Sequence, residues 1–353
     1  MGGTPELRAS LDQRLGGCGP IGDTEPRLPS RLRITLKELR RWLECPVQGG
    51  VALRLGVRSQ EDEDPADVAD FPMDTSPLDQ WWLLRRSFWS HLAQGESLDA
   101  SYARVREETE SHAKAPIGAL GEGERERHLG TLSQWQQQVG ETAGVSLHRF
   151  GTGLPFETQG LPVQNHPALV LTLDHPLGRT EVHLEGLTEP MHDDAFLLMS
   201  TREGTTKGPA EKDRISALRA WVGHLTLCAQ GVAKPRSAHL HSAPRKRDKA
   251  AAWTLPLPTV APEEAQALLA GWCGEILLEG VQKLLPIEAL LGGKDIPDLQ
   301  DWIQDKRDDA DGATLTSFRG PVPRVKDLPV DDLGTGRRRL GAFLDLQSGW
   351  ERA

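Results

Sequence analysis

The residues best suited to hold a metal ion are two histidines and two aspartates in the second half of the chain. His239 and His241 alternate along a predicted strand, so both side chains face the same side of it. Because no cysteine or carboxylate lies close to them in the sequence, we interpret them as a surface pair rather than as half of a zinc site. Asp193 and Asp194 are adjacent in a predicted turn, where acids are typical of solvated surface. None of these residues alone predicts a reaction centre.

Motifs for nucleophiles and cofactors are equally sparse in the sequence. The phosphate-binding pattern GxxxxGK[ST] does not occur, and the one GxGxxG match, at residues 17–22, has no strand before it and no helix directly after it. No serine, histidine and aspartate stand in a recognisable nucleophile context. The four cysteines, Cys18, Cys45, Cys228 and Cys273, form no CxxC pair, which argues against a disulfide framework or a zinc site. We therefore expect a protein of the reducing cytoplasm.

Two short basic runs are the candidates for contacts with phosphate groups. They are Arg245, Lys246, Arg247 and Lys249, and Arg337, Arg338 and Arg339. Basic side chains bind phosphate oxygens, but such runs in loops are also common as plain solvated surface. The chain carries 41 Lys and Arg against 51 Asp and Glu, a formal charge of −10, which argues against a free-standing nucleic-acid-binding protein.

The length of 353 residues fits two domains, or one large domain with extensions. Residues 1–29 are predicted to form a mobile leader, and they lack the features of a secretory signal. The main folded domain is expected at 30–285, with a helical block at 78–140 and an α/β core at 145–260, followed by an extension at 286–353. No apolar run is long enough to span a membrane, so no membrane contact is expected.

The local pattern predicts the order of the elements. Thr35 and Glu38 form a capping box that starts a helix ending before Pro46. One apolar face is predicted for the first helix of the block, through Leu78, Trp81, Trp82, Phe88, Trp89 and Leu92. Further helices are predicted near 98–112, 124–140, 215–228, 262–280 and 297–308. Strands are predicted at 168–173, 181–187, 195–199, 236–241 and 251–257. Together these elements, with helices before and after the strands in the sequence, indicate an α/β fold.

Several segments in this order resemble a known family. They are Arg33–Pro46, Leu53–Val57, Asp70–Asp74, Leu78–Arg85, Pro116–Glu122 and Ala217–Leu225. The first resembles the opening helix of RecB/AddB-type nuclease domains, and the whole set is similar to the C-terminal domain of the exodeoxyribonuclease V gamma subunit, the RecC family. This resemblance implies the PD-(D/E)XK fold of restriction endonucleases: a central mixed sheet flanked by helices, here with a helical insertion and a C-terminal extension.

The resemblance also implies that the cleavage chemistry has been lost. Active relatives place aspartates in the second and third strands, and a lysine two residues after the latter. Here Thr188, Ser200 and Arg202 stand at those positions. Hydroxyl groups cannot replace two carboxylates on Mg²⁺, so no metal is expected. Arg202 would instead place a cation where the ion's charge would be, and it is a further DNA-binding candidate. The iron–sulfur cluster of AddB-type relatives is not implied either, since only Cys45 fits.

The implied role is that of a non-catalytic member of an exodeoxyribonuclease V complex. It would dock the beta subunit, with the alpha subunit as a second candidate partner, and guide double- and single-stranded DNA during recombinational repair of double-strand breaks. Mg²⁺ and ATP would be used by the partner subunits. Two alternatives stay open: a stand-alone nuclease whose metal site has moved to Asp193 and Asp194 or to Glu185, and a scaffold without a DNA role.

Overall fold

The computed structural model describes residues 30–44, 46, 49, 72–140, 144–152, 158, 160–175, 178–203, 208–232, 235–243, 252–278 and 332–352, the last range with side chains from Arg339 onward. The predicted leader at 1–29, the predicted helix at 297–308 and the basic run at 245–249 lie outside the described residues, as do the side chains of Arg337 and Arg338. No helix in the described part of the chain has the length and apolar character to cross a membrane.

The predicted capping box is present at the start of helix α2 (Leu36–Glu44). The backbone N–H of Glu38 donates to Thr35 Oγ1 at 3.1 Å, and the backbone N–H of Thr35 donates to Glu38 Oε2 at 2.8 Å. These bonds satisfy two donors that a helix start leaves unpaired. The preceding residues form strand β1 (Arg31–Thr35), which the sequence pattern did not predict.

The first of two five-stranded sheets centres on the long strand β5 (Gly178–Leu187). Strand β1 pairs with β5 in parallel, and β4 (Leu169–His175) and β2 (Leu147–Phe150) pair with it in antiparallel fashion. Strand β3 (Val163–His166) pairs with β2 in parallel. The sheet is therefore mixed, as expected.

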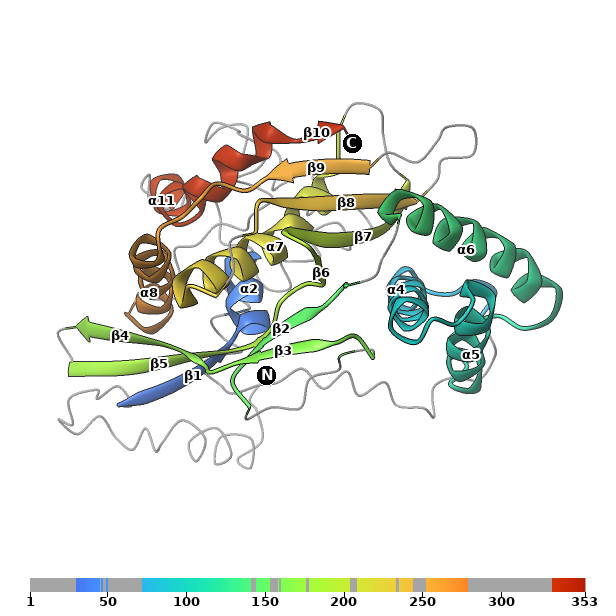
Figure 1. The fold of residues 1–353 in the computed structure, drawn as a ribbon, viewed down its shortest axis with the longest axis horizontal. Coiled ribbons are helices and arrows are strands. Elements are labelled where there is room, and N and C mark those ends of the chain that lie inside the picture. Colours follow the sequence, from blue (N-terminus) through green and yellow to red (C-terminus); the bar gives the residue numbers. More distant parts are fainter. Residues whose placement is uncertain are drawn as a thin grey trace, which may run out of the picture.

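The second sheet has the order β10-β9-β8-β7-β6, with β6 at Met191–His192, β7 at Ala195–Glu203, β8 at Ser237–Ala243, β9 at Ala252–Pro256 and β10 at Glu351–Arg352. Strands β7 and β8 are parallel because helix α7 (Glu211–Gln230) crosses between them. An isolated bridge between Ser146 and Met191 connects the two sheets. The single central sheet of the prediction is thus two sheets, and Figure 1 shows α7 between them.

Strand β7 is buried on both faces, which explains its continuous apolar run. Phe196 and Leu198 belong to the core around α7, whereas Leu197 and Met199 belong to a second core under the helical block. Because side chains alternate along a strand, Ser200 and Arg202 share the α7 face with Phe196 and Leu198. Register along β7 therefore fixes which layer each candidate residue meets.

The helical block comprises α4 (Pro77–Gln94), α5 (Leu98–Ser111) and α6 (Gly118–Val139), at the right of Figure 1. Trp89 and Trp135 are buried in its core. The predicted apolar face is wrong for Leu78 and Trp82, which are exposed. The buried face includes Ser87 and Ser90 instead, where small side chains allow close packing.

The remaining helices are α8 (Pro262–Leu278) and α11 (Asp332–Leu346), followed by a short 3-10 turn, η4 (Gln347–Gly349). Both helices contribute side chains to the core around α7. The mixed α/β class is confirmed. Strands β2, β3, β6 and β10 and helix α11 were not predicted, because each strand is short and α11 follows a segment without a clear pattern.

Candidate functional site

Two of the three residues that the resemblance places at former catalytic positions, Ser200 and Arg202, meet a buried acid on the neighbouring helix. The hydroxyl of Ser200 donates to Asp213 Oδ1 at 2.6 Å, and Arg202 Nη1 donates to the same oxygen at 2.9 Å. Asp213 is 1% exposed, whereas the Arg202 side chain is 48% exposed. The guanidinium therefore neutralises the carboxylate from the solvent side, and the hydroxyl completes the arrangement from within.

The position of Asp213 follows from the crossover that joins the two parallel strands. Helix α7 begins at Glu211, and Asp213 lies in its first turn, where the positive end of the helix dipole stabilises an anion. The end of β7 brings Ser200 and Arg202 to this turn. Sequence reasoning missed Asp213, although an acid in the first turn of the helix after the candidate strand was a usable signal.

The third degenerate position, Thr188, is engaged with a different strand. Its backbone N–H donates to the carbonyl of His148 at 3.0 Å, and its Oγ1 accepts from the backbone N–H of His148 at 3.2 Å. Its Cβ also lies 3.5 Å from where a Cβ on Gly223 of α7 would be. Thr188 is buried and structural in this position, with its hydroxyl turned toward β2.

The next residue, Glu189, is the centre of a buried arginine cluster. Arg85 Nη2 lies 2.8 Å from Glu189 Oε2, and Arg219 Nη1 lies 3.9 Å from Glu189 Oε1. Burial alone would raise the pKa of Glu189, but the charges of Arg85, Arg219 and Arg40 outweigh it and hold the pKa below its usual value. Burial also lowers the pKa of Arg85, and the neighbouring Arg219 lowers it further. The carboxylate is thus ionised and shared between guanidinium groups from three helices.

Trp81 joins this cluster to the Arg202 pair. The guanidinium carbon of Arg85 lies 4.4 Å from the centre of the Trp81 ring, and that of Arg219 lies 5.1 Å from it. Trp81, Arg85 and Arg219 line a recess of about 20 Å³ together with Ser200, Arg202 and Asp213. This space is enough for about one water molecule and too small for a nucleotide.

The donor set around this recess does not fit Mg²⁺. A hard cation needs several free oxygen ligands, but Asp213 and Glu189 are each already paired with arginine. Among the described residues no group of three His, Cys, Asp or Glu side chains is arranged to hold a metal ion. We therefore derive no metal-dependent step at this centre.

The acids of the alternative metal site are not grouped as metal ligands. Glu185 is buried on β5 and pairs with Arg33 at 3.2 Å. Asp193 and Asp194 lie in the turn before β7, where Asp194 pairs with Arg236 at 3.2 Å, and ~3.3 Å per residue places Asp194 about 20 Å from Ser200 along the strand. Within the described residues these acids form no group of three possible metal ligands.

The two strand histidines differ from the predicted surface pair. His241 is 3% exposed, and burial lowers its pKa to about 3; its Nδ1 lies 3.2 Å from Gln138 Oε1. The surface interpretation is wrong for His241 because helix α6 covers this face of β8. His239 is half-buried and lies 3.1 Å from Ser237 Oγ.

The candidate phosphate contacts also separate. Arg202 is accessible at the recess, as described above. Arg339 is 3% exposed, with its Nε 2.5 Å from Glu275 Oε2 and its guanidinium carbon 4.6 Å from the centre of the Trp42 ring. This placement makes Arg339 part of the core and does not fit a contact with DNA. The side chains of Arg245, Lys246, Arg247, Lys249, Arg337 and Arg338 lie outside the described residues.

Comparison with known proteins bears on the same part of the chain. A family model described as the RecC C-terminal domain matches residues 32–292, which include β1 from its second residue and all later described strands and helices through α8. A search of curated proteins found no match.

Proposed function

The chain belongs to the RecC C-terminal domain family, and from this premise we propose that it is a non-catalytic, nuclease-like component of an exodeoxyribonuclease V complex. Its fold would be a PD-(D/E)XK fold whose catalytic centre has been replaced. It would dock the beta subunit, with the alpha subunit as a second partner, and guide DNA strands in double-strand-break repair in the cytoplasm. Mg²⁺ and ATP would be used by those partners.

The observation that carries the proposal is the charge balance of the former centre. Asp213 and Glu189 are neutralised by Arg202, Arg85 and Arg219, so the site is electrostatically complete without an ion. An active centre of this type needs the opposite arrangement, with excess negative charge that a divalent cation balances. The arrangement supports a scaffold role.

A cleavage assay tests the absence of catalysis. The purified chain is incubated with linear duplex and single-stranded DNA in Mg²⁺ or Mn²⁺, beside Asp213→Asn and Asp194→Asn variants. We expect no cleavage above the background of the variants. Cleavage by the wild-type chain that either substitution abolishes would establish the migrated-site nuclease instead.

Guidance of DNA is tested at Arg202, the accessible cation of the recess. Affinity for a single-stranded oligonucleotide is measured across a salt series for the wild type, Arg202→Gln and the matched control Arg127→Gln, whose residue is exposed on the acidic α6. Loss of one phosphate contact should weaken binding and lower the salt slope by ~1 in the Arg202 variant. Equal binding by all three proteins would remove Arg202 from the DNA path.

Docking is tested by co-expression with the beta subunit encoded by the same genome. We expect the two chains to co-purify through size-exclusion chromatography. A chain that elutes alone, and that also shows no affinity for DNA at low salt, would support the scaffold without a DNA role.

A further inference from the structure

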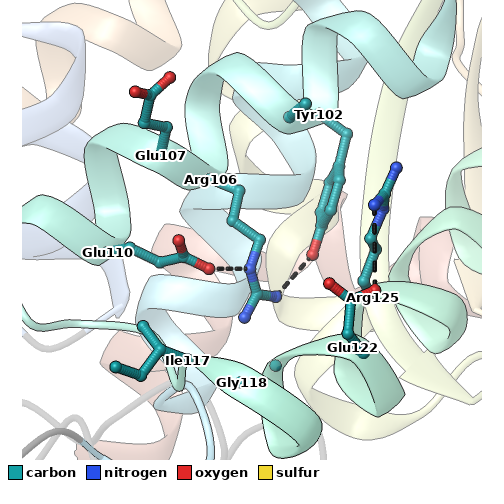
Figure 2. Close-up of a pocket in the computed structure, with 10 residues that line it drawn as sticks. Tyr102, Arg106, Glu107, Glu110, Ile117, Gly118, Glu122 and Arg125 are labelled. Carbon is teal, nitrogen blue, oxygen red and sulfur yellow. Dashed lines mark hydrogen bonds and ion pairs between the residues drawn. The ribbon is translucent and has the colours of Figure 1, made fainter.

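A second pocket lies in the helical block, between α5 and the start of α6. It has a volume of about 250 Å³ and is lined by Tyr102, Ala103, Arg106, Glu107, Glu110, Ile117, Gly118, Gly121, Glu122 and Arg125. Figure 2 shows Arg106 reaching from α5 across the base of this pocket. Small-molecule sites usually measure ~300–1,000 Å³, so this pocket matches a single long side chain better than a whole ligand.

The base of the pocket is rigid and already satisfied. Arg106 Nε donates to Glu110 Oε1 at 2.7 Å, its Nη1 donates to the Tyr102 hydroxyl at 2.7 Å, and its Nη2 donates to the carbonyl of Pro116 at 2.6 Å. A second carboxylate, Glu124, lies 3.1 Å from Nη1. Burial lowers the pKa of Arg106, but these partners raise it more. With two carboxylates on one guanidinium, the base does not attract an external anion.

The rim of the pocket carries surplus negative charge. Glu107 is exposed and makes no hydrogen bond or ion pair within the described residues. Glu122 is 75% exposed and has one distant ionic neighbour, Arg125, at 3.9 Å. Arg125 is itself shared with Asp99 at 3.8 Å. The rim therefore favours a cation and repels phosphates.

Apolar side chains stand beside this acidic rim. Ile117, which lines the pocket, is 50% exposed, and Leu120, in the first turn of α6, is 54% exposed. Of the exposed large apolar side chains of the described residues, Leu78, Trp82, Ile117 and Leu120 lie in or next to the helices of this block, Met73 lies just before α4, and Val170 and Val232 lie elsewhere. Exposed apolar groups around a pocket are typical of a protein-binding surface.

We infer that this pocket receives an arginine or lysine side chain from a partner protein, with apolar residues of the same segment on Ile117 and Leu120. The inference rests on the proposed role as a docking subunit and names the chemistry of the contact. The cationic head would lie between Glu107 and Glu122, above the filled base, while its aliphatic stem covers Ile117. DNA is disfavoured on this face because the rim is acidic.

The test uses the full chain and the co-expressed beta subunit. Affinity is measured for the wild type, for Glu107→Lys with Glu122→Lys, and for Glu126→Lys, an exposed acid on the same helix that does not line the pocket. We expect the pocket variant to bind about tenfold more weakly or worse, and the control to change by about twofold or less. Circular dichroism and thermal unfolding confirm that each variant is folded.

A second experiment, with peptides, distinguishes failure of this inference from failure of the proposed function. Labelled octapeptides with a central Arg, Lys, Gln or Glu between Leu, Ile or Phe residues are titrated into the same proteins. If the beta subunit binds wild type and pocket variant equally, the inference is overturned and the docking role stands. If the beta subunit does not bind, but basic peptides bind the wild type and lose affinity for the pocket variant, the inference stands and the proposed partner falls. Binding of neither probe overturns both.

Discussion

Neutralising Glu189 should destabilise the protein far more than neutralising a matched surface acid. The substitution Glu189→Gln keeps the size of the side chain and removes the charge that Arg85, Arg219 and Arg40 share. The chain offers a close control, because Arg86–Glu108 has the same 2.8 Å separation as Arg85–Glu189. The two pairs differ in burial: their side chains are 11% and 12% exposed in the first pair and 34% and 47% in the second.

The magnitude follows from the distances. At an effective dielectric constant of ~20, Coulomb's law gives about 6 kcal/mol for a charge pair at 2.8 Å and about 4 kcal/mol at 3.9 Å. Desolvation of the groups offsets most of this attraction in the intact cluster. Removing the carboxylate leaves the desolvation cost of the arginines uncompensated, so we expect a loss of about 3–5 kcal/mol. The exposed pair should contribute about 0–1 kcal/mol.

The assay is urea unfolding at pH 7 of the wild type, Glu189→Gln, Glu108→Gln and the matching Arg→Met single and double variants. Two double-mutant cycles then give the coupling energy of each pair. The pKa of Glu189 is lowered in the folded state, so its contribution is fully present above the unfolded value of 4.5 and is lost as the pH falls through the folded value. The gap between wild type and Glu189→Gln should therefore shrink below pH 4.5. Equal costs for the two neutralisations would refute the buried-cluster argument.

Three further substitutions test other parts of the structure. Asp213→Asn should cost about 1–2 kcal/mol in urea unfolding because Arg202 and a buried hydroxyl lose a charged acceptor, and an unchanged midpoint would contradict this assignment. Folding lowers the pKa of His241 from 6.5 to about 3, so protonation of this residue favours the unfolded state. The free energy of unfolding should therefore fall by about 2 kcal/mol from pH 7 to pH 5. A folded His241→Gln variant should lose this part of the pH dependence of stability. Gly121→Ala should lower the melting temperature because the added Cβ would lie 2.6 Å from the backbone carbonyl oxygen of Pro116. Gly130→Ala on the same helix meets nothing within 4 Å and should stabilise the protein by ~1 kcal/mol. Melting temperatures that shift in the same direction in both variants would contradict the packing at the pocket base.

The sequence predicted those elements whose local signals are strong. The capping box of Thr35 and Glu38 fixed the start of α2, and the buried run of β7 and the amphipathic α7 were expected nearly where they lie. Strands of four or five residues such as β1 and β2 were missed, because their stability comes from pairing with β5 rather than from their own pattern. Local periodicity does not report such long-range pairing.

The candidate centre was predicted by position but not by partner. The family resemblance singled out Ser200 and Arg202, yet nothing in the sequence linked them to Asp213 or indicated that Glu189 would pair with Arg85 and Arg219. Arg339 shows the opposite error, since a run of three arginines suggests solvent exposure while the fold buries this one against Trp42 and Glu275. Sequence patterns do not show when the tertiary fold buries a long cationic side chain.

The arginine-filled centre also explains why a single reversion should not recreate a metal site. In Ser200→Asp a second carboxylate would stand where a hydroxyl now lies 2.6 Å from Asp213, so repulsion would raise the pKa of one of the two acids. Arg202 would remain 2.9 Å from Asp213 Oδ1 and would compete with a cation for that carboxylate. A functional ion would need Arg202 removed as well, together with the charges of Arg85 and Arg219 across the recess. On the proposed function, the cations around Asp213 and Glu189 would therefore oppose metal binding as much as the absence of further carboxylates does.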